Sequence, residues 1–294
     1  MTTYVETEIA AQPDCWRRAT ELAPAYAEVL PQPGERVAVV GCGTSWFMAM
    51  SYAALREQGG LGWTDAFAGS EFPFGRDYDR LVAITRSGTT SEIVSLLQRT
   101  SIPATVITAC PGEPAAAQGG AVVDLSFADE ESVVQTRFAT TTLALLRASL
   151  GHSLDAAIVD AEAALAVDVA PWVPSTQVSF LGRGWTIGLA QEAALKAREA
   201  SQTWCEAYPA MDYRHGPIAI AEPGRLVWMF GEPPTGLADD VAATGAELVT
   251  SELDPLAHLV VAQRLAVAKA QALGLDPDRP RSLTRAVVLS PEQV

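Results

Sequence analysis

Residues 36–60 read RVAVVGCGTSWFMAMSYAALREQGG. A short run of β-branched and small apolar residues ends in a Gly-x-Gly turn at Gly41–Gly43, and a helical pattern begins directly after it. This order predicts a buried parallel strand, a tight turn and a helix, which together form the first unit of an α/β fold.

The same order recurs down the first half of the chain. Strand-like runs occur at LVAIT (81–85), ATVITA (104–109) and AVVDLSF (121–127), with a helical pattern at SEIVSLLQRT (91–100). A longer helix is predicted at about 135–150, and an N-terminal segment looks helical from Cys15 to Leu30. Short apolar strands that alternate with helices predict a parallel sheet with helices on both faces.

A second cycle starts with QVSFLGRGWTIGLAQEAALKAREASQ at 177–202. Gly182 lies 141 residues after Gly41, which is one domain length, so we expect an internal repeat of a whole α/β domain. Two prolines interrupt the pattern at 171–175. The predicted division is an N-terminal helical segment over 1–30, a first domain over 31–170 and a second domain over 171–294.

Composition excludes several classes of protein. The chain has 294 residues, 49% hydrophobic residues and a formal charge of −15, which fits a folded protein and argues against a nucleic-acid binder. The four cysteines form no CxxC pair, so neither a metal site nor a disulfide framework is expected. The acidic N-terminus lacks a signal peptide and no apolar run reaches membrane-spanning length, so a cytoplasmic location is expected.

The two turns in the first half are rich in hydroxyl groups. Gly43-Thr44-Ser45 and the segment 85–90 (TRSGTT) each follow a strand and open a helix, where free N–H groups and the helix dipole attract a phosphate. Dinucleotide binding is disfavoured because the third Gly of GxGxxG is missing. A structural alternative stays open, since Thr89 and Glu92 have the spacing of a capping box.

A second candidate cluster lies on the helix after Gly184. Glu192, Lys196 and Glu199 share one helical stripe, and Lys196 is one of only two lysines beside 18 arginines. The alternative is a solvated ladder of ion pairs, but this stripe lies among Ala and Leu residues. Downstream, His215 precedes Gly-Pro in a predicted loop; a lone His is more often structural than catalytic.

These motifs, taken in order, resemble the tandem sugar-isomerase (SIS) domain family, which includes the isomerase half of glucosamine-6-phosphate synthase and stand-alone phosphosugar isomerases, deaminases and deglycases. The resemblance covers nearly the whole chain. Its motifs are CGTS (42–45), SEF (70–72), TRSGTT (85–90), ESVVQTRF (131–138), EAALKAREAS (192–201), EAYPAMDYRHGP (206–217) and DRPRSLTRAV (278–287).

The resemblance implies two flavodoxin-like domains and an active site at a homodimer interface, with a sugar phosphate as the ligand and no cofactor. It gives Glu199 the role of the base between C1 and C2, with Lys196 and Glu192 as supporting charges. His215 becomes the ring-opening acid/base, supplied by the neighbouring subunit. The substrate-binding positions implied by the resemblance are Gly43, Thr44, Ser45, Thr85, Arg86, Ser87, Thr90, Val134 and Arg285.

Arg285, in the C-terminal tail that the resemblance assigns to the active site, departs from the family pattern. In the synthase this position carries a Lys that forms a Schiff base with the ketose. A guanidinium stays protonated and cannot act as that amine nucleophile, so imine chemistry at residue 285 is not expected. Arg285 is instead suited to hold a carboxylate, a phosphate or a hydroxyl.

Three functions are compatible with these residues. The first is an isomerase or deaminase of a hexose or aminosugar 6-phosphate that uses Glu199 as its base. The second is a dehydratase or etherase-type lyase, in which loss of the C2 proton is followed by expulsion of the C3 substituent. The third is a non-catalytic phosphosugar sensor, which the Glu199 and His215 pair makes less favoured.

Overall fold

The first sheet contains five parallel strands in the order β2-β1-β3-β4-β5. This computed structural model describes residues 2–290, 292 and 293. The chain leaves β1 toward one side of the sheet and later returns to the other side, so the strand order reverses between β1 and β3. The strands are β1 (Val37–Gly41), β2 (Thr64–Ala68), β3 (Arg80–Ile84), β4 (Ala104–Thr108) and β5 (Ala121–Asp124).

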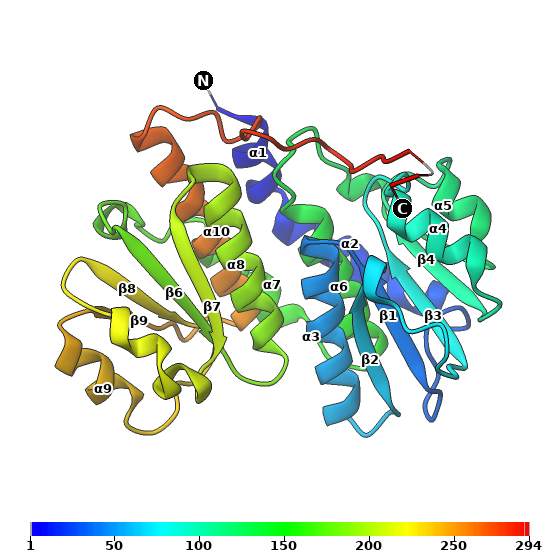
Figure 1. The fold of residues 1–294 in the computed structure, drawn as a ribbon, viewed down its shortest axis with the longest axis horizontal. Helices are drawn as coiled ribbons and strands as arrows, with labels where there is room; N and C mark the ends of the chain where they lie inside the picture. The colour runs from blue at the N-terminus through cyan, green and yellow to red at the C-terminus, as the bar shows by residue number, and fades with distance from the viewer. Residues whose placement is uncertain (1, 291, 294) are drawn as a thin grey trace. The chain divides into compact units, whose positions relative to one another are not determined.

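Helices cover both faces of the first sheet. Val40 and Leu81 point to the face where Ile93 of α4 (Ser91–Arg99) and Ala115 of α5 (Pro114–Gln118) complete a buried core. Side chains alternate along a strand, so Val39 points to the opposite face. There α3 (Thr44–Gln58) packs on β1, β2 and α6 (Arg137–Ser149), as Figure 1 shows.

The second sheet repeats the strand order of the first. Its four parallel strands lie in the order β7-β6-β8-β9, which matches β2-β1-β3-β4. Gly41 and Gly182 each end the central strand; a Cβ on Gly41 would lie 2.5 Å from the backbone of Ser45, and one on Gly182 would collide with the backbone of Thr186. The strands are β6 (Gln177–Gly182), β7 (Trp204–Pro209), β8 (Arg225–Met229) and β9 (Glu247–Val249).

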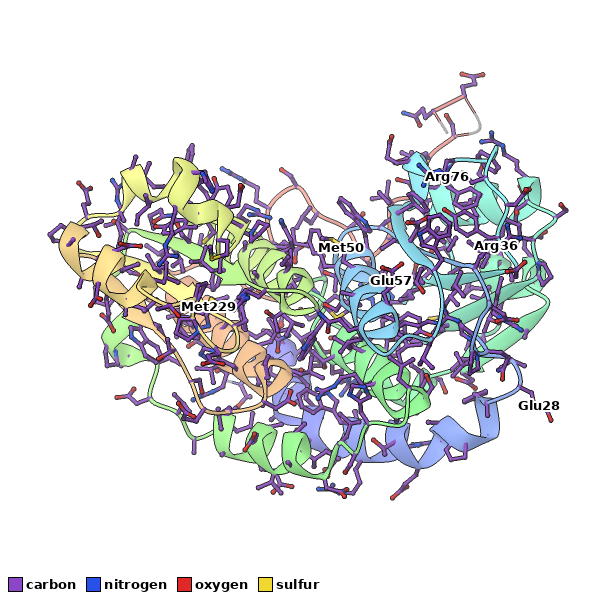
Figure 2. All side chains as sticks on the ribbon, turned by 90° about the horizontal axis from the view of Figure 1, so that it is seen from below. Glu28, Arg36, Met50, Glu57, Arg76 and Met229 are labelled. Atoms are coloured by element: carbon purple, nitrogen blue, oxygen red, sulfur yellow. The ribbon has the colours of Figure 1, made fainter. Side chains whose placement is uncertain are left out.

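Helices also cover both faces of the second sheet. Leu181 and Met229 pack on one face against Leu237 of α9 (Leu237–Thr244). Met229 is labelled in Figure 2. Phe180 and Trp228 point to the other face, where α8 (Thr186–Ser201) and α10 (Pro255–Ala272) lie against each other. The prediction of parallel sheets with helices on both faces is therefore confirmed.

The helices outside the sheets begin earlier than the sequence pattern predicts. Instead of one helical segment from Cys15, the chain forms α1 (Tyr4–Ala10), α2 (Gln12–Leu22) and a 3₁₀ turn, η1 (Ala23–Tyr26). Thr3 and Glu6 close a capping box that starts α1, a signal that is present in the sequence. The remaining elements are α7 (Asp155–Ala164), η2 (Gly69–Glu71), η3 (Ser126–Ala128), η4 (Ala170–Trp172), η5 (Asp212–His215) and η6 (Pro217–Ile220).

The chain divides into two compact units, and both are discontinuous in sequence. The first-sheet unit comprises Asp14–Glu130, Arg137–Leu154 and the described residues from Thr284 onward. The second-sheet unit comprises the described residues up to Pro13, Glu131–Thr136 and Asp155–Leu283. Each sheet lies within one predicted domain. The C-terminal segment 284–290, however, belongs to the first-sheet unit and not to the second, because its contacts are with the first-sheet unit. The contiguous domain bounds stay a prediction.

In the part of the chain that the structure describes, no helix combines the length and apolar character that crossing a bilayer requires. Within the same residues, no cluster of three or more His, Cys, Asp or Glu side chains is arranged to hold a metal ion. The four cysteines are free thiols. The expected cytoplasmic location stays a prediction.

His258 makes the second-sheet core sensitive to acid. Its ring is 2% exposed and stacks on Trp228 with the ring centroids 4.7 Å apart. Burial penalises the imidazolium form and lowers the pKa of His258 to about 4. Between this pKa and the ordinary value of 6.5, the unfolded chain binds the proton and the folded chain does not, so stability falls as pH drops through this range.

We therefore predict that His258 alone removes roughly 3 kcal/mol of unfolding free energy between pH 6.5 and pH 4. His258→Phe keeps a ring beside Trp228 and cannot be protonated, so it should flatten this part of the pH profile. Urea unfolding at a series of pH values measures the effect, with the exposed His152→Gln as the matched control. A His258→Phe profile as steep as that of the wild type would contradict the prediction.

Candidate functional site

The hydroxyl-rich turns of the first-sheet unit lie at the carboxyl ends of β1 and β3. These are the strands between which the strand order reverses, and open α/β sheets bind ligands at such a switch point. Gly43 caps α3 with φ at +54°, a conformation that favours glycine. Thr44 and Ser45 form the first turn of α3 and are 5% and 4% exposed.

The turn after β3 presents buried hydroxyl groups. Ser87 Oγ accepts hydrogen bonds from Thr89 N at 3.2 Å and Thr89 Oγ1 at 3.1 Å, so its own hydrogen is left to donate. Thr85 is 3% exposed, and its Oγ1 has no hydrogen-bond partner among the described residues. Gly88 takes φ of +67°, and a Cβ there would lie 2.7 Å from Glu113 Cβ.

The capping alternative for this turn is wrong. The N-cap of α4 is the half-buried Thr90 and not Thr89, and the Thr90 side chain makes no capping bond. The N–H of Ser91 instead donates to the carbonyl of Val287 at 3.1 Å, and Leu289 N donates to Ser91 Oγ at 2.8 Å. The C-terminal segment 284–290 thus supplies the cap that the local sequence lacks.

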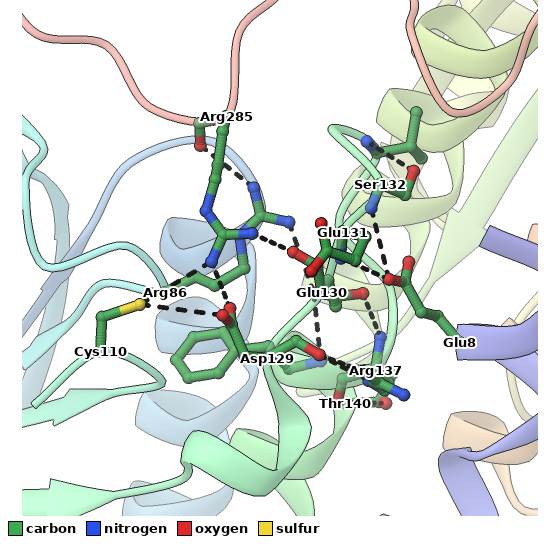
Figure 3. A network of polar contacts seen from close by, with 12 residues as sticks. Glu8, Arg86, Cys110, Asp129, Glu130, Glu131, Ser132, Arg137, Thr140 and Arg285 are labelled. Atoms are coloured by element: carbon green, nitrogen blue, oxygen red, sulfur yellow. Dashed lines mark hydrogen bonds and ion pairs between the residues drawn. The ribbon is translucent and has the colours of Figure 1, made fainter. Parts of the chain in front are cut away.

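Arg86 and Arg285 belong to one network of charged groups in the first-sheet unit (Figure 3). Arg86 lies 3.6 Å from the Glu130 carboxylate, with side-chain exposures of 2% and 0%, and donates to the carbonyl of Arg285 at 3.1 Å. The Arg285 guanidinium donates to Asp129 Oδ1 and to the carbonyl of Glu130. Arg285 therefore holds a carboxylate of its own chain.

Burial and ion pairing act in opposite directions on this network. Burial disfavours the charged guanidinium of Arg285, but the hydrogen bonds to Asp129 and Cys110 and the charges of these two groups together outweigh it and raise the pKa of Arg285. Arg285 Nη2 lies 3.7 Å from Cys110 Sγ. Burial raises the pKa of the Cys110 thiol, and the nearby Asp129 carboxylate adds to this shift. Cys110 is therefore a neutral thiol at neutral pH.

Asp129 and Glu130 are the functional candidates that the sequence analysis missed. Glu130 Oε1 accepts the N–H of Arg137 at 2.8 Å, so this carboxylate also caps α6. The available signal was a run of three acidic residues at 129–131, separated by one residue from the predicted strand at 121–127. In the second-sheet unit, Glu8 Oε1 similarly accepts the N–H of Glu131 at 2.6 Å.

The second-sheet unit brings the predicted stripe of charges together on α8. Lys196 Nζ lies 2.5 Å from Glu199 Oε2 and 3.6 Å from Glu192 Oε1. Glu192 and Lys196 have side-chain exposures of 0% and 1%, whereas Glu199 is 18% exposed. The alternative of a solvated ladder is therefore wrong, because the apolar helix face buries the pair.

Two other residues that the sequence analysis predicted for the site, His215 and Val134, also belong to the second-sheet unit. His215 is exposed at the end of η5, and no hydrogen bond or ion pair joins it to the triad among the described residues. Val134 is 2% exposed in the segment that follows Glu131. Its neighbour Val133 donates its N–H to the carbonyl of Asp278 at 3.0 Å.

Comparisons with known proteins agree with these motifs. No family model matches the chain. The glutamine–fructose-6-phosphate aminotransferase (isomerizing) of Pyrobaculum aerophilum is 27% identical over 97% of this chain and 57% of its own length. The chain thus spans little more than half the length of this relative.

Solved structures share the fold over nearly the whole chain. The C-terminal domain of glucosamine-fructose-6-phosphate aminotransferase from Francisella tularensis has a TM-score of 0.83 at 20% identity and covers 95% of this chain and 99% of its own. Glucosamine-6-phosphate deaminase from Thermotoga maritima has a TM-score of 0.78 at 24% identity, with 98% and 100% covered. The chain therefore has the α/β fold of phosphosugar isomerase and deaminase structures.

The buried pair on α8 predicts a specific pattern of stability. Lys196→Met leaves the Glu192 carboxylate buried without its cation and should cost about 3–5 kcal/mol of unfolding free energy. Adding Glu192→Leu removes that charge and should recover part of the loss. Urea unfolding of the wild type, the single variant and the double variant measures this. A double variant no more stable than Lys196→Met would show that Lys196 does not compensate the charge of Glu192.

Proposed function

We propose that this chain is a phosphosugar isomerase or deaminase that acts on a hexose or aminosugar 6-phosphate. The observation that carries the proposal is the triad on α8, in which Lys196 is buried against Glu192 and holds the partly exposed Glu199. The similarity to aminotransferases of fructose 6-phosphate and the shared fold of phosphosugar structures support this substrate class.

Glu199 is the proposed base at C1 and C2. Lys196 donates to Glu199 Oε2 and so fixes the orientation of the carboxylate, while the second oxygen remains to take up a proton. Glu192 balances the charge of Lys196, so the three side chains together carry one negative charge. Glu199 takes the proton from C2 of the open-chain aldose to give an enediol, or an enolamine from an aminosugar, and returns a proton to C1.

In the deaminase reaction the amine leaves after this proton transfer. The enolamine protonated at C1 is a C2 imine, to which water adds; the C2–N bond then breaks and releases ammonia and a ketose 6-phosphate. Arg285 cannot form a Schiff base with the ketose, and its guanidinium is engaged by Asp129. The proposed reaction accordingly uses no covalent enzyme intermediate at this position.

The hydroxyl-rich turns are the proposed phosphate site. Ser87 offers a hydroxyl hydrogen, Thr85 has a buried hydroxyl without a partner among the described residues, and the N-terminus of α3 adds the positive end of its helix dipole. Thr44, Ser45 and Thr90 are the other proposed contacts. A phosphate held by fixed donors would orient the sugar, which contributes to catalysis by proximity.

A panel of hexose and aminosugar 6-phosphates tests the proposed reaction. We expect at least one substrate to give an isomer of unchanged mass, or ammonia and a ketose phosphate. Glu199→Gln should lower kcat by about 10²–10⁴-fold with little change in KM, because the amide keeps the shape and cannot accept the proton. Mass spectrometry, an ammonia assay and steady-state kinetics provide the measurements.

Other outcomes of the same panel separate the alternative functions. A product with an ultraviolet chromophore and loss of the C3 substituent would identify a lyase. Tight binding of a phosphosugar without turnover would identify a sensor. Activity of Glu199→Gln within tenfold of the wild type would remove Glu199 as the base.

The proposal extends to a homodimer with shared active sites. His215 is exposed on a short 3₁₀ turn and is not paired with the α8 triad, which suits a residue that acts on a neighbouring subunit. The family resemblance gives it the role of opening the sugar ring. A closed two-fold dimer would then place each His215 at its partner's site.

Mixing two inactive variants tests this arrangement. Glu199→Gln and His215→Ala should each be inactive, and a mixture should recover activity in the heterodimers, where one site carries neither change. Random pairing gives about half heterodimers, so up to roughly a quarter of all sites should work. Mass-labelled subunits serve as the control for exchange. Absence of recovery after demonstrated exchange would place both residues in one chain's site.

A further inference from the structure

We propose that Arg86 and Arg285 are positioning residues that lock the C-terminal segment 284–290 onto the turn 85–90 and so fix the shape of that turn. The substrate role of the turn rests on the proposed function, whereas the lock itself does not. The four side chains that form the lock are Arg86, Arg285, Asp129 and Glu130, and they are named here the double-arginine latch.

The first half of the latch is a buried ion pair. Arg86 lies two residues after the end of β3. Its guanidinium lies against Glu130, and both side chains are almost fully buried. Glu130 is itself held by the N–H groups of Arg137 at 2.8 Å and Phe138 at 3.4 Å, at the N-terminus of α6. Because the carboxylate is fixed from two sides, the direction of the Arg86 side chain is fixed as well.

The second half of the latch ties the C-terminal segment to the same loops. Arg285 donates to Asp129 Oδ1 and to the carbonyl of Glu130, while its own carbonyl accepts a hydrogen bond from Arg86 at 3.1 Å. Figure 3 shows Arg285 reaching toward Asp129 and Cys110, with Arg86 directed at its backbone. Arg86 therefore holds the backbone of Arg285, and Arg285 holds the backbone of Glu130, the ion-pair partner of Arg86.

The segment then contacts the far end of the turn. Two residues after Arg285, the Val287 carbonyl accepts the N–H of Ser91, and Leu289 N donates to Ser91 Oγ. The turn is thus held at its start by the Arg86 side chain and at its end by Ser91, in both cases through the C-terminal segment. Between these two points lie Ser87 and Thr90, the proposed phosphate contacts.

Charge balance separates this role from direct phosphate binding. The latch contains two guanidinium groups and two carboxylates, so its four side chains carry no net charge. Arg86 pairs with Glu130 and donates to the carbonyl of Arg285. Arg285 pairs with Asp129 and donates to the carbonyl of Glu130. Both arginines therefore act on the turn through geometry, and the phosphate is left to hydroxyl and N–H donors.

Hydrogen–deuterium exchange of the full chain tests the latch without any substrate. The buried Arg86–Glu130 pair is a poor target, because breaking it leaves a buried charge and risks misfolding. Arg285 and Asp129 are 37% and 38% exposed, so Arg285→Met and Asp129→Asn should both fold. Each should raise exchange about fivefold in peptides covering 284–290 and also in peptides covering 85–93, the upper range for a partly exposed ion pair.

The double variant and a matched control complete the design. Arg285→Met combined with Asp129→Asn should exchange no faster than Arg285→Met alone, because Asp129→Asn removes an interaction that Arg285→Met already removes. Arg285→Lys should restore part of the protection, and the exposed Arg281→Met, four residues earlier, should change nothing. Faster exchange in 284–290 alone, or no change in either peptide, would overturn the proposal.

Ligand measurements separate this proposal from the proposed function. Arg285→Met should weaken binding of glucose 6-phosphate about fivefold and leave the thermal midpoint nearly unchanged, and in a working assay it should raise KM more than it lowers kcat. If the wild type binds no phosphosugar, the proposed function fails while the exchange data still decide the latch. If exchange rises in both peptides but phosphosugar affinity is unchanged, the claim that the latch shapes the phosphate site is overturned.

Discussion

Each unit of this protein contains a buried ion pair, in which a cation lies against a carboxylate. Lys196 meets Glu192 in the second-sheet unit, and Arg86 meets Glu130 in the first-sheet unit; in each pair the side-chain exposures are 2% or less. Because removing a charge from water is costly, replacing only one member of such a pair leaves the other charge buried without compensation and destabilises the fold. Each pair adjoins a residue with a proposed chemical role, Glu199 in one unit and Ser87 in the other. The charge requirement thus fixes the geometry of the surrounding loops and helix face.

Parallel strand order decides where these residues are displayed. In both sheets the central strand ends at a glycine whose replacement would collide with the following helix, so the helix starts immediately after the strand. In the first sheet, the turns after β1 and β3 therefore emerge at the same edge, next to the reversal of strand order. The C-terminal segment reaches this edge from the other end of the chain and caps α4.

The sequence predicted what depends on local pattern. The strands around Gly41 and Gly182, the repeat that links them and the charged stripe of α8 all follow from spacing over a few residues. The burial of Lys196 was also foreseeable, because its helix neighbours are Ala and Leu. The helical start at Tyr4 was missed although Thr3 and Glu6 have the spacing of a capping box.

Contacts between segments far apart in the sequence could not be predicted from local spacing. Arg285 pairs with Asp129 across 156 residues, and no periodicity in the sequence marks this pairing. A long sequence separation also explains why Thr89 is not the cap of α4: the carbonyl of residue 287 accepts a hydrogen bond at the helix start, so no local side chain has to. Roles that involve a second subunit, such as the one proposed for His215, are likewise not encoded in the spacing of one chain.

Isotope exchange at C2 of the substrate tests the central claim most directly. The wild-type chain is incubated in deuterated water with glucosamine 6-phosphate and with fructose 6-phosphate, and the sugars are followed by nuclear magnetic resonance and mass spectrometry. Proton transfer by Glu199 predicts that deuterium enters at C1 or C2 of at least one of these sugars, in the fraction of events in which Glu199 exchanges the proton with solvent before it returns one. Turnover without any deuterium at either carbon, or the complete absence of exchange while the sugar phosphate is bound, would contradict the account.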